Sequence, residues 1–438
     1  MTSALTAGAV AAAASLVATP FVRRLAVLLG ATDEPGARRV HQRSIPRAGG
    51  LAVTVAAAVG VALADFPGRD LAPSLGAGLG LILGVGLLDD LFTLGPRAKL
   101  AAQGAAALLA AAGGLRLELF GPSTAGALAL VDAALTVLWI VLITNALNLC
   151  DGLDGLAPGI GVIALGWLAY AALQHGNLTT AVPALAVAGA LAGFLPYNFN
   201  PASIFLGDSG SLVVGYTIAV LPLAGPGRDA PPPLAVFLLV AVPATDTLLA
   251  IARRFCSRCL RAWGDGRFWH GIREGLRNTV RPDRRHIHHR LLDLGFTQRR
   301  AVLTLYLAAG ATGALAHLVT RSPAWPVDLL ALGLGLGIIG LVRALGIDEL
   351  RPARSGLLLP VLRRFARRRS LVLLADLCLI ASAYAAALAL TSRGGGRAEA
   401  LVAAIGVVAI SQLTAFAVLG VYRTAWEATG VGGLPLLL

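Results

Sequence analysis

Carboxylates and carboxamides crowd the segment from Asn145 to Pro158, which lies between two long apolar runs. Asn148, Asp151 and Asp154 recur every third residue, so an α-helical end would place them on one side. An unpaired carboxylate at the end of a membrane-spanning segment is costly, and Mg²⁺ favours a few carboxylates together with substrate phosphates. The segment therefore predicts a cation and phosphate site; a helix end with solvated aspartates is the simpler alternative.

Two further acidic clusters fit the same chemistry. Asp89 and Asp90 are adjacent, and two neighbouring carboxylates repel, so we expect a cation or a strong donor beside them. Gly207 to Gly210 forms a glycine-rich turn whose backbone N–H groups are suited to a phosphate. Asp208 in this turn is a candidate metal ligand, and Phe205 could stack on a flat base. The alternatives are a solvated acidic end and an ordinary helix N-cap.

A histidine cluster supplies the opposite charge. His286, His288 and His289 stand beside Arg284 and Arg285. Histidines can bind zinc, but the arginines raise the cost of adding a cation and suit a polyphosphate instead. Binding of anionic lipid by a basic juxtamembrane stretch is the competing interpretation.

The composition indicates a polytopic membrane protein. The chain has 438 residues, of which 57% are hydrophobic and 13% charged, with a mean hydropathy of +0.76. Its four cysteines give no disulfide framework, and Cys256 and Cys259 lack a second ligand pair for zinc. About thirteen apolar spans of near-membrane length are expected, at 4–22, 49–65, 71–88, 98–113, 126–144, 156–174, 178–195, 210–225, 232–251, 300–320, 327–346, 371–391 and 399–421.

Basic residues are distributed unevenly between the two sets of alternating loops. Most fall in 23–48, 89–97, 145–155, 196–209, 252–299, 347–370 and the tail from 422. The positive-inside rule places these loops in the cytoplasm. This asymmetry accounts for most of the net charge of +13, so no nucleic-acid partner is needed. The polar clusters share this side, which predicts one composite site on cytoplasmic loops; a transporter would place polar groups near the midplane.

The order of these motifs resembles the polyprenyl-phosphate N-acetylhexosamine-1-phosphate transferases, a branch of glycosyltransferase family 4. That family shares an Asp-Asp pair, an N-x-x-N-x-x-D-G-x-D-G-L-A stretch, an F-x-G-D-[ST]-G-S-L stretch, a histidine-rich loop and a P-x-x-G-G region. The motifs stand here at Asp89-Asp90, Asn145–Ala157, Phe205–Leu212, His286–His289 and His41–Gly50. The resemblance covers roughly residues 1–345.

The resemblance also implies a sugar donor. The peptidoglycan branch, which uses UDP-MurNAc-pentapeptide, carries a His-His-His-x-Glu stretch, whereas this chain has His286-Ile-His-His-Arg290. This looks like the branch that transfers GlcNAc-1-phosphate from UDP-GlcNAc to undecaprenyl phosphate and releases UMP. That reaction starts O-antigen, common-antigen or teichoic-acid linkage synthesis at the cytoplasmic face of a bacterial inner membrane.

The resemblance implies roles for individual residues. Mg²⁺ or Mn²⁺ would be held by Asp208 and Asp151, and uridine by Asn198, Phe205 and Asp154. Asp89 would orient the acceptor phosphate or take its residual proton, and Asp90 would help to place the acceptor or metal. The expected catalytic set is Asp89, Asp90, Asp151, Asp154, His286, His288 and His289. The expected substrate-binding set is His41, Arg47, Asn145, Asn148, Asp154, Asn198, Phe205, Arg284 and Arg285.

We therefore expect an all-α polytopic membrane protein with about 11 family helices and about 2 extra C-terminal helices. The transferase domain would occupy 1–346, with a basic cytoplasmic loop at 252–299, a basic linker at 347–370 and a two-helix extension at 371–438. A homodimer stays open. So do three other functions: phospho-MurNAc-pentapeptide transfer, lipid or sugar transport, and an inactive scaffold. We expect direct attack by the lipid phosphate on the β-phosphorus of the donor, and a two-step route through an aspartyl-phosphate is the rival.

Overall fold

The computed structural model describes residues 1–34, 44–65, 72–121, 125–224, 233–248, 250–251, 286–293 and 295–321. These belong to one compact unit. Several predictions lie outside the described residues: His41, Arg284, Arg285, the pair Cys256 and Cys259, the linker 347–370 and the extension 371–438.

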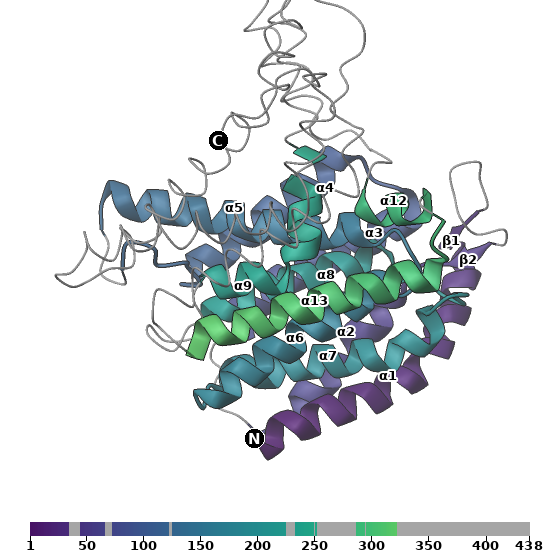
Figure 1. Cartoon of the computed structure of the whole chain (residues 1–438), viewed down its shortest axis with the longest axis horizontal. Helices are drawn as coiled ribbons and strands as arrows, with labels where there is room; N and C mark the ends of the chain where they lie inside the picture. The colour runs from purple at the N-terminus through teal and green to yellow at the C-terminus, as the bar shows by residue number, and fades with distance from the viewer. Residues whose placement is uncertain are drawn as a thin grey trace, which may run out of the picture. The chain divides into compact units, whose positions relative to one another are not determined.

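The described part of the chain is mostly helical (Figure 1). Its long helices are α1 (Thr2–Leu28), α2 (Gly49–Leu63), α3 (Ala72–Phe92), α4 (Pro96–Ala112), α5 (Ala127–Cys150), α6 (Leu156–Gln174), α7 (Leu178–Asn198), α8 (Gly207–Val220) and α13 (Gln298–Arg321). Shorter pieces are η2 (Leu221–Ala224), α9 (Pro233–Leu239), a helical stretch at 241–248, and α12 (Ile287–Asp293).

Six helices in the described ranges are long and apolar enough to cross a membrane. They are Thr2–Leu28, Leu75–Phe92, Ala127–Cys150, Leu156–Gln174, Leu178–Asn198 and Gly207–Ala224. This confirms a helical polytopic membrane protein. The all-α expectation missed one small feature: β1 (Thr32–Asp33) pairs antiparallel with β2 (Ile45–Pro46).

Helix α8 is the centre of the packing. Its residues from Ser209 to Val220 are all buried, and α2, α3, α5 and α6 pack around it. Helix α7 packs against α1, and their backbones come close, because a Cβ added at Gly189 would lie 2.1 Å from the carbonyl oxygen of Gly8. Helix α13 lies along α6 and α9 (Figure 1). The first turn of α8 is therefore surrounded by the ends of several helices.

Several helices run further than the apolar pattern predicted. Helix α3 continues to Phe92, α5 to Cys150 and α7 to Asn198, while α8 already begins at Gly207. The predicted span ends are therefore too short, and six polar residues that follow or precede the predicted spans lie on helix ends: Asp89, Asp90, Asn145, Asn148, Asn198 and Asp208. A helix end leaves backbone groups without an intrahelical partner, and polar side chains from other helices satisfy several of them here. In contrast, Asp151 and Asp154 lie in a turn after α5, so they do not continue its helical face.

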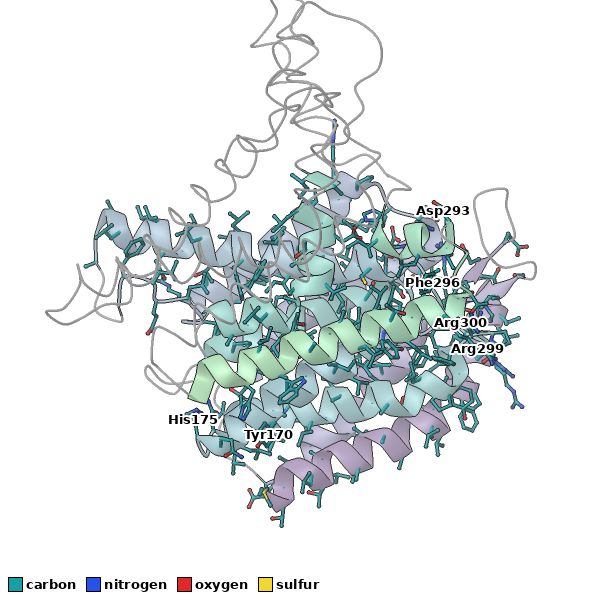
Figure 2. All side chains as sticks on the ribbon, in the orientation of Figure 1. Tyr170, His175, Asp293, Phe296, Arg299 and Arg300 are labelled. Carbon is teal, nitrogen blue, oxygen red and sulfur yellow. The ribbon has the colours of Figure 1, made fainter. Side chains whose placement is uncertain are left out.

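The residues labelled in Figure 2 mark the two ends of the helical unit. Figure 2 places Asp293, Phe296, Arg299 and Arg300 at one end of the molecule and Tyr170 and His175 at the other. The strands β1 and β2 and helix α12 lie at the Arg299 end (Figure 1).

Candidate active site

Lys99 joins two of the predicted carboxylates. Its Nζ lies 2.6 Å from Asp208 Oδ2 and 3.4 Å from Asp89 Oδ2. The three residues come from α4, α8 and α3. Asp89 is buried, and its other carboxylate oxygen accepts the Leu94 N–H at 2.7 Å. The strong donor expected beside Asp89 is therefore this lysine.

Sequence reasoning did not single out Lys99, although the composition contains a signal. Among the 36 lysines and arginines of the chain, Lys99 is the sole lysine. An ammonium is a compact point charge, whereas a guanidinium is a flat fork, so the two side chains are not equivalent at a crowded site. A chain that otherwise uses arginine throughout thus has a compact cation between two carboxylates.

The Asp90 carboxylate binds the backbone of the turn that carries Asp208. Its carboxylate is almost fully buried and accepts hydrogen bonds from Asp208 N at 2.9 Å, Ser209 N at 3.2 Å and Ser209 Oγ at 2.6 Å. An anion is favoured at a helix N-terminus, so Asp90 caps α8 from α3. Gly207 has φ +74° and its backbone lies against the Asp90 carboxylate, where a Cβ would be 2.5 Å from Oδ2.

This arrangement corrects two predictions. The N–H groups of Asp208 and Ser209 were expected to face a phosphate, but they bind the protein's own carboxylate. The alternative, in which Asp208 or Ser209 is itself the N-cap of α8, is also wrong. The residue at the N-cap position makes no side-chain hydrogen bond, and the Asp90 carboxylate accepts the capping hydrogen bond instead.

Arg47 binds the backbone carbonyl groups of Asp89 and Asp90. Its Nε donates to the carbonyl oxygen of Asp90 at 3.0 Å, and its Nη2 to Asp89 O at 3.4 Å and Thr93 Oγ1 at 3.1 Å. It therefore caps the C-terminus of α3, where a cation is favourable. The structure places this predicted substrate-binding residue against backbone carbonyls, where it positions Asp89 and Asp90.

Backbone groups between residues 46 and 50 also hold the segment before Asp208 in place. Phe205 N donates to Pro46 O at 2.8 Å, and Gly49 N donates to Phe205 O at 3.0 Å. Gly50 N donates to Leu206 O at 2.8 Å. A Cβ at Gly50 would lie 2.0 Å from Gly210 N, so the glycine lets the first turns of α2 and α8 meet. The ring of Phe205 is half-buried.

The turn 151–155 joins α5 to α6 and is fixed by Asn198. The Asn198 Oδ1 accepts Gly155 N–H at 3.0 Å, and its Nδ2 donates to Ile204 O at 2.9 Å. Asn198 is only 2% exposed. The prediction that this amide reads uracil stays a prediction, and the structure favours a structural role, because both polar atoms bind backbone groups in the buried interior. Tyr306 from α13 supports the same turn by donating to the Gly155 carbonyl.

Asp154 in this turn also has protein partners. Its Oδ2 accepts Asn200 Nδ2 at 2.9 Å and Ala202 N at 3.1 Å. The side chain is half-buried, so its uridine role is not excluded by burial. Asn145 lies one turn before Asn148 on α5, and Asn148 Nδ2 donates to Ser211 Oγ at 2.9 Å on α8.

Asp151 lies in the electric field of the other carboxylates. Burial raises the pKa of the Asp151 carboxyl well above its ordinary value, and the negative charges of Asp208 and Asp90 raise the pKa further. A raised pKa means that these surroundings disfavour the charged carboxylate, and a nearby cation would oppose the shift. The charge of Asp208, the other residue predicted as a metal ligand, thus acts on Asp151.

The fit to a magnesium ion can be judged from these donors. Within the described ranges, no three or more His, Cys, Asp and Glu side chains are grouped so that they could hold a metal. Mg²⁺ usually takes one or two carboxylates and completes its shell with water and substrate phosphates. Asp208 and Asp151 suit that ligand set, and the Lys99 ammonium shows that Asp208 accepts a cation.

The histidines are held by a carboxylate that sequence reasoning missed. His286 Nδ1 lies 2.8 Å from Asp246 Oδ2, and Ile287 N donates to Asp246 Oδ1 at 3.1 Å. Burial, with a smaller contribution from the charge of His289, lowers the pKa of His288 to about 3. A Cβ at Gly152 would lie 2.3 Å from His288 Nε2, so this ring packs on the turn that carries Asp151. The signal for Asp246 was a lone carboxylate inside an apolar run.

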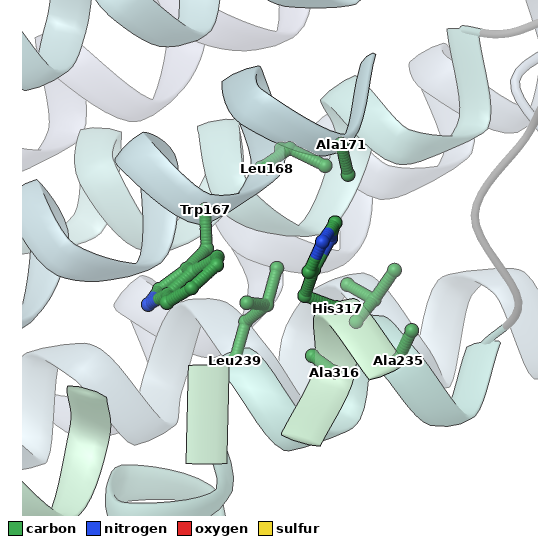
Figure 3. Close-up of a pocket in the computed structure, with 8 residues that line it drawn as sticks. Trp167, Leu168, Ala171, Ala235, Leu239, Ala316 and His317 are labelled. Atoms are coloured by element: carbon green, nitrogen blue, oxygen red, sulfur yellow. The ribbon is translucent and has the colours of Figure 1, made fainter. Parts of the chain in front are cut away.

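A separate apolar pocket lies between α6, α9 and α13 (Figure 3). It is lined by Trp167, Leu168, Ala171, Ala235, Val236, Leu239, Ala316 and His317. None of the predicted site residues lines it.

Comparisons with known proteins agree with the motif order. The sequence profile described as glycosyl transferase family 4 matches residues 72–225. A Bacillus subtilis (strain 168) protein named "Probable undecaprenyl-phosphate N-acetylglucosaminyl 1-phosphate transferase" is 37% identical over 297 residues, covering 67% of this chain and 78% of the relative. A Mycolicibacterium smegmatis protein named "Decaprenyl-phosphate N-acetylglucosaminephosphotransferase" is 38% identical, with 69% and 79% covered.

A more distant relative is the Escherichia coli (strain K12) protein named "Undecaprenyl-phosphate alpha-N-acetylglucosaminyl 1-phosphate transferase". It is 26% identical, with 71% of this chain and 83% of the relative covered. The matched region contains the cluster formed by Lys99, Asp89 and Asp208. The chain therefore belongs to glycosyl transferase family 4.

Proposed function

We propose that this protein transfers GlcNAc-1-phosphate from UDP-GlcNAc to a polyprenyl phosphate, releasing UMP and forming polyprenyl-diphosphate-GlcNAc. The observation that carries the proposal is the contact of Lys99 with both Asp89 and Asp208 at the meeting point of three helices. The names of the relatives supply the sugar and the lipid class. The transporter and scaffold alternatives have no comparable support.

The reaction brings two anions together. A phosphate monoester has a second pKa near 6, so a polyprenyl phosphate is mostly dianionic at neutral pH. It needs positioning and charge compensation more than deprotonation. Lys99 contacts both Asp89 and Asp208, and it would exchange a carboxylate contact for the acceptor phosphate.

We assign direct displacement to the site. An acceptor phosphate oxygen attacks the β-phosphorus of UDP-GlcNAc, forming the new phosphorus–oxygen bond. The bond from the β-phosphorus to the bridging oxygen breaks, and UMP leaves with that oxygen. Asp89 orients the acceptor or takes its residual proton. Asp208 and Asp151 would hold Mg²⁺, which supplies positive charge to the diphosphate when bound.

The remaining residues shape the site. Asp90, Arg47 and Asn198 keep the carboxylate-bearing segments in place through backbone contacts. His286, His288 and His289 would steady the donor diphosphate, and Asp154 and Phe205 would hold the uridine. A site on the cytoplasmic side follows from the arginine-rich loops, where the soluble nucleotide sugar and the membrane-embedded lipid can meet.

The test is a UMP-release assay on the purified full chain with polyprenyl phosphate and MgCl₂. UDP-GlcNAc, UDP-GalNAc and UDP-MurNAc-pentapeptide are compared as donors, each with and without excess chelator. We expect metal-dependent turnover with UDP-GlcNAc and a lipid-linked GlcNAc product. Turnover with UDP-MurNAc-pentapeptide alone would assign the peptidoglycan reaction, and absence of turnover with every donor would contradict the proposal.

A further inference from the structure

The side chain of Asn200 connects Asp154 to the first turn of α13. Its Nδ2 donates to Asp154 Oδ2 at 2.9 Å and to Gln298 Oε1 at 2.8 Å. The backbone carbonyl oxygen of Asn200 accepts a hydrogen bond from Arg299 Nε at 2.9 Å. An ionised carboxylate only accepts hydrogen bonds, so the amide nitrogen of Asn200 is the atom that must face Asp154. An amide nitrogen carries two hydrogens, and these two contacts use both of them.

The contacts of Asp154 leave one of its carboxylate oxygens available. Ala202 N donates to the same Oδ2 at 3.1 Å, so two donors hold this oxygen. Among the described residues, no hydrogen-bond donor binds Oδ1. Asp154 is half-buried, so its carboxylate is not closed off from solvent. Because Oδ2 is fixed on two donors, Oδ1 is the acceptor that remains for a ligand.

The position of Asp154 fits a contact with the nucleotide. Ala202, which binds Asp154, precedes Phe205 by three positions, and three extended residues span at most about 11 Å. Burial, two other carboxylates and the charge of Asp154 raise the pKa of Asp151, in that order. Asp154 is therefore within reach of both the Phe205 segment and the acidic residues that would meet the diphosphate.

We infer that Asn200 is a positioning residue for the nucleobase of the donor, acting through Asp154. Asn200 holds Asp154 Oδ2, and Oδ1 accepts the N3–H of a uracil that stacks on Phe205. Asn200 itself does not contact the nucleotide, and Gln298 of α13 holds it in place. The inference rests on the proposed function and goes beyond it by assigning the orientation of Asp154 to a residue outside the predicted site.

A pair of nucleotides tests this hydrogen bond directly. UMP carries the N3 hydrogen, and N3-methyl-UMP lacks it. Their dissociation constants are measured by isothermal titration calorimetry on the purified full chain in detergent with MgCl₂. We expect Asn200→Ala to weaken UMP binding by about 5- to 10-fold, as for loss of one hydrogen bond. Binding of N3-methyl-UMP should change by less than about twofold, because that ligand never makes the contact.

Further variants separate this role from a general loss of structure. Gln298→Ala removes the anchor of the Asn200 amide and should weaken UMP binding selectively, by less than Asn200→Ala does. In an Asp154→Ala background, Asn200→Ala should cause no further loss of UMP affinity, because the two residues act as one unit. Asn177→Ala is the matched control, since it removes an asparagine hydrogen bond to Thr180 N at the start of α7. This control should keep the wild-type affinity for both ligands.

The outcomes distinguish the inference from the proposed function. An equal fold loss for UMP and N3-methyl-UMP would overturn the inference, and so would wild-type UMP affinity in both Asn200→Ala and Gln298→Ala. If Asn200→Ala does not fold, the ligand-selective loss in Gln298→Ala decides the question. A selective loss of UMP affinity in a chain that does not turn over UDP-GlcNAc would support the inference and contradict the transfer reaction. Absence of UMP binding to the wild-type chain would overturn both.

Discussion

The ammonium of Lys99 lies 2.6 Å from Asp208 Oδ2, which makes the chain's sole lysine the direct partner of the carboxylate that we propose as a metal ligand. Lys99 also reaches Asp89 at 3.4 Å. This cation balances two carboxylates that would otherwise repel. In the proposed reaction, the same cation would bind the acceptor phosphate.

Replacement of Lys99 should therefore affect catalysis strongly. We expect Lys99→Met to lower kcat by about 10²- to 10³-fold, the range for loss of one preorganised charge contact. Lys99→Arg should be intermediate, because the charge is kept and the compact shape is lost. Steady-state UMP release measures both, and Arg97→Gln, exposed in the same helical turn, is the control. Full activity in Lys99→Met would remove the lysine from the mechanism.

Asp90 should contribute to stability as well as activity. Asp90→Asn replaces one acceptor oxygen by a donor that faces Ser209 N and Oγ. Leaving these buried donors unpaired should destabilise the fold by about 1–3 kcal/mol. Thermal unfolding in detergent measures the change, with exposed Asp65→Asn as the control. An unchanged unfolding midpoint would show that the capping contacts do not matter.

Asn198 should also behave as a structural residue. Asn198→Ala leaves Gly155 N–H and Ile204 C=O without their side-chain partner, so we expect a loss of about 1–3 kcal/mol in stability. The melting midpoint and the UDP-GlcNAc KM are measured together. A higher KM with an unchanged midpoint would restore Asn198 as a uridine contact.

The low pKa of His288 predicts a pH-dependent stability. Its pKa is lowered from 6.5 to about 3, so between these values the unfolded state binds the proton and the folded state does not. Stability from the neutral His288 is present above pH 6.5 and is lost as the pH falls toward 3, by at most about 1.4 kcal/mol per pH unit.

Unfolding midpoints from pH 7.5 to 5 test this dependence. The acid-side decrease should be weaker in His288→Gln than in wild type. His175→Gln, which alters an exposed histidine, should keep the wild-type slope. Parallel pH curves for wild type and His288→Gln would show that His288 is not buried in its neutral form.

Six of the predicted spans are helices of membrane length in the described residues, and they were predictable because each is a continuous apolar run. The ends of these helices could not be predicted from the local sequence. Asp89 and Asn148 continue their helices because their side chains bind Lys99 and Ser211 on other helices. The carboxylates of the site were visible as costly charges beside apolar segments. The contacts of Lys99 and the burial of the Asn198 side chain depend on tertiary packing, so the sequence alone did not predict them. Asp246 had only its position in an apolar run to indicate a function.

The most direct test of the central claim is a single-turnover measurement of UMP release with wild-type protein in excess over UDP-GlcNAc, with Mg²⁺, and with or without polyprenyl phosphate. Direct displacement at the cluster of Lys99, Asp89 and Asp208 predicts UMP and lipid-linked GlcNAc in equal amounts, only when acceptor is present, and strongly slowed release in Lys99→Met. A stoichiometric burst of UMP without acceptor, together with a sugar-phosphate adduct on the protein, would contradict the account.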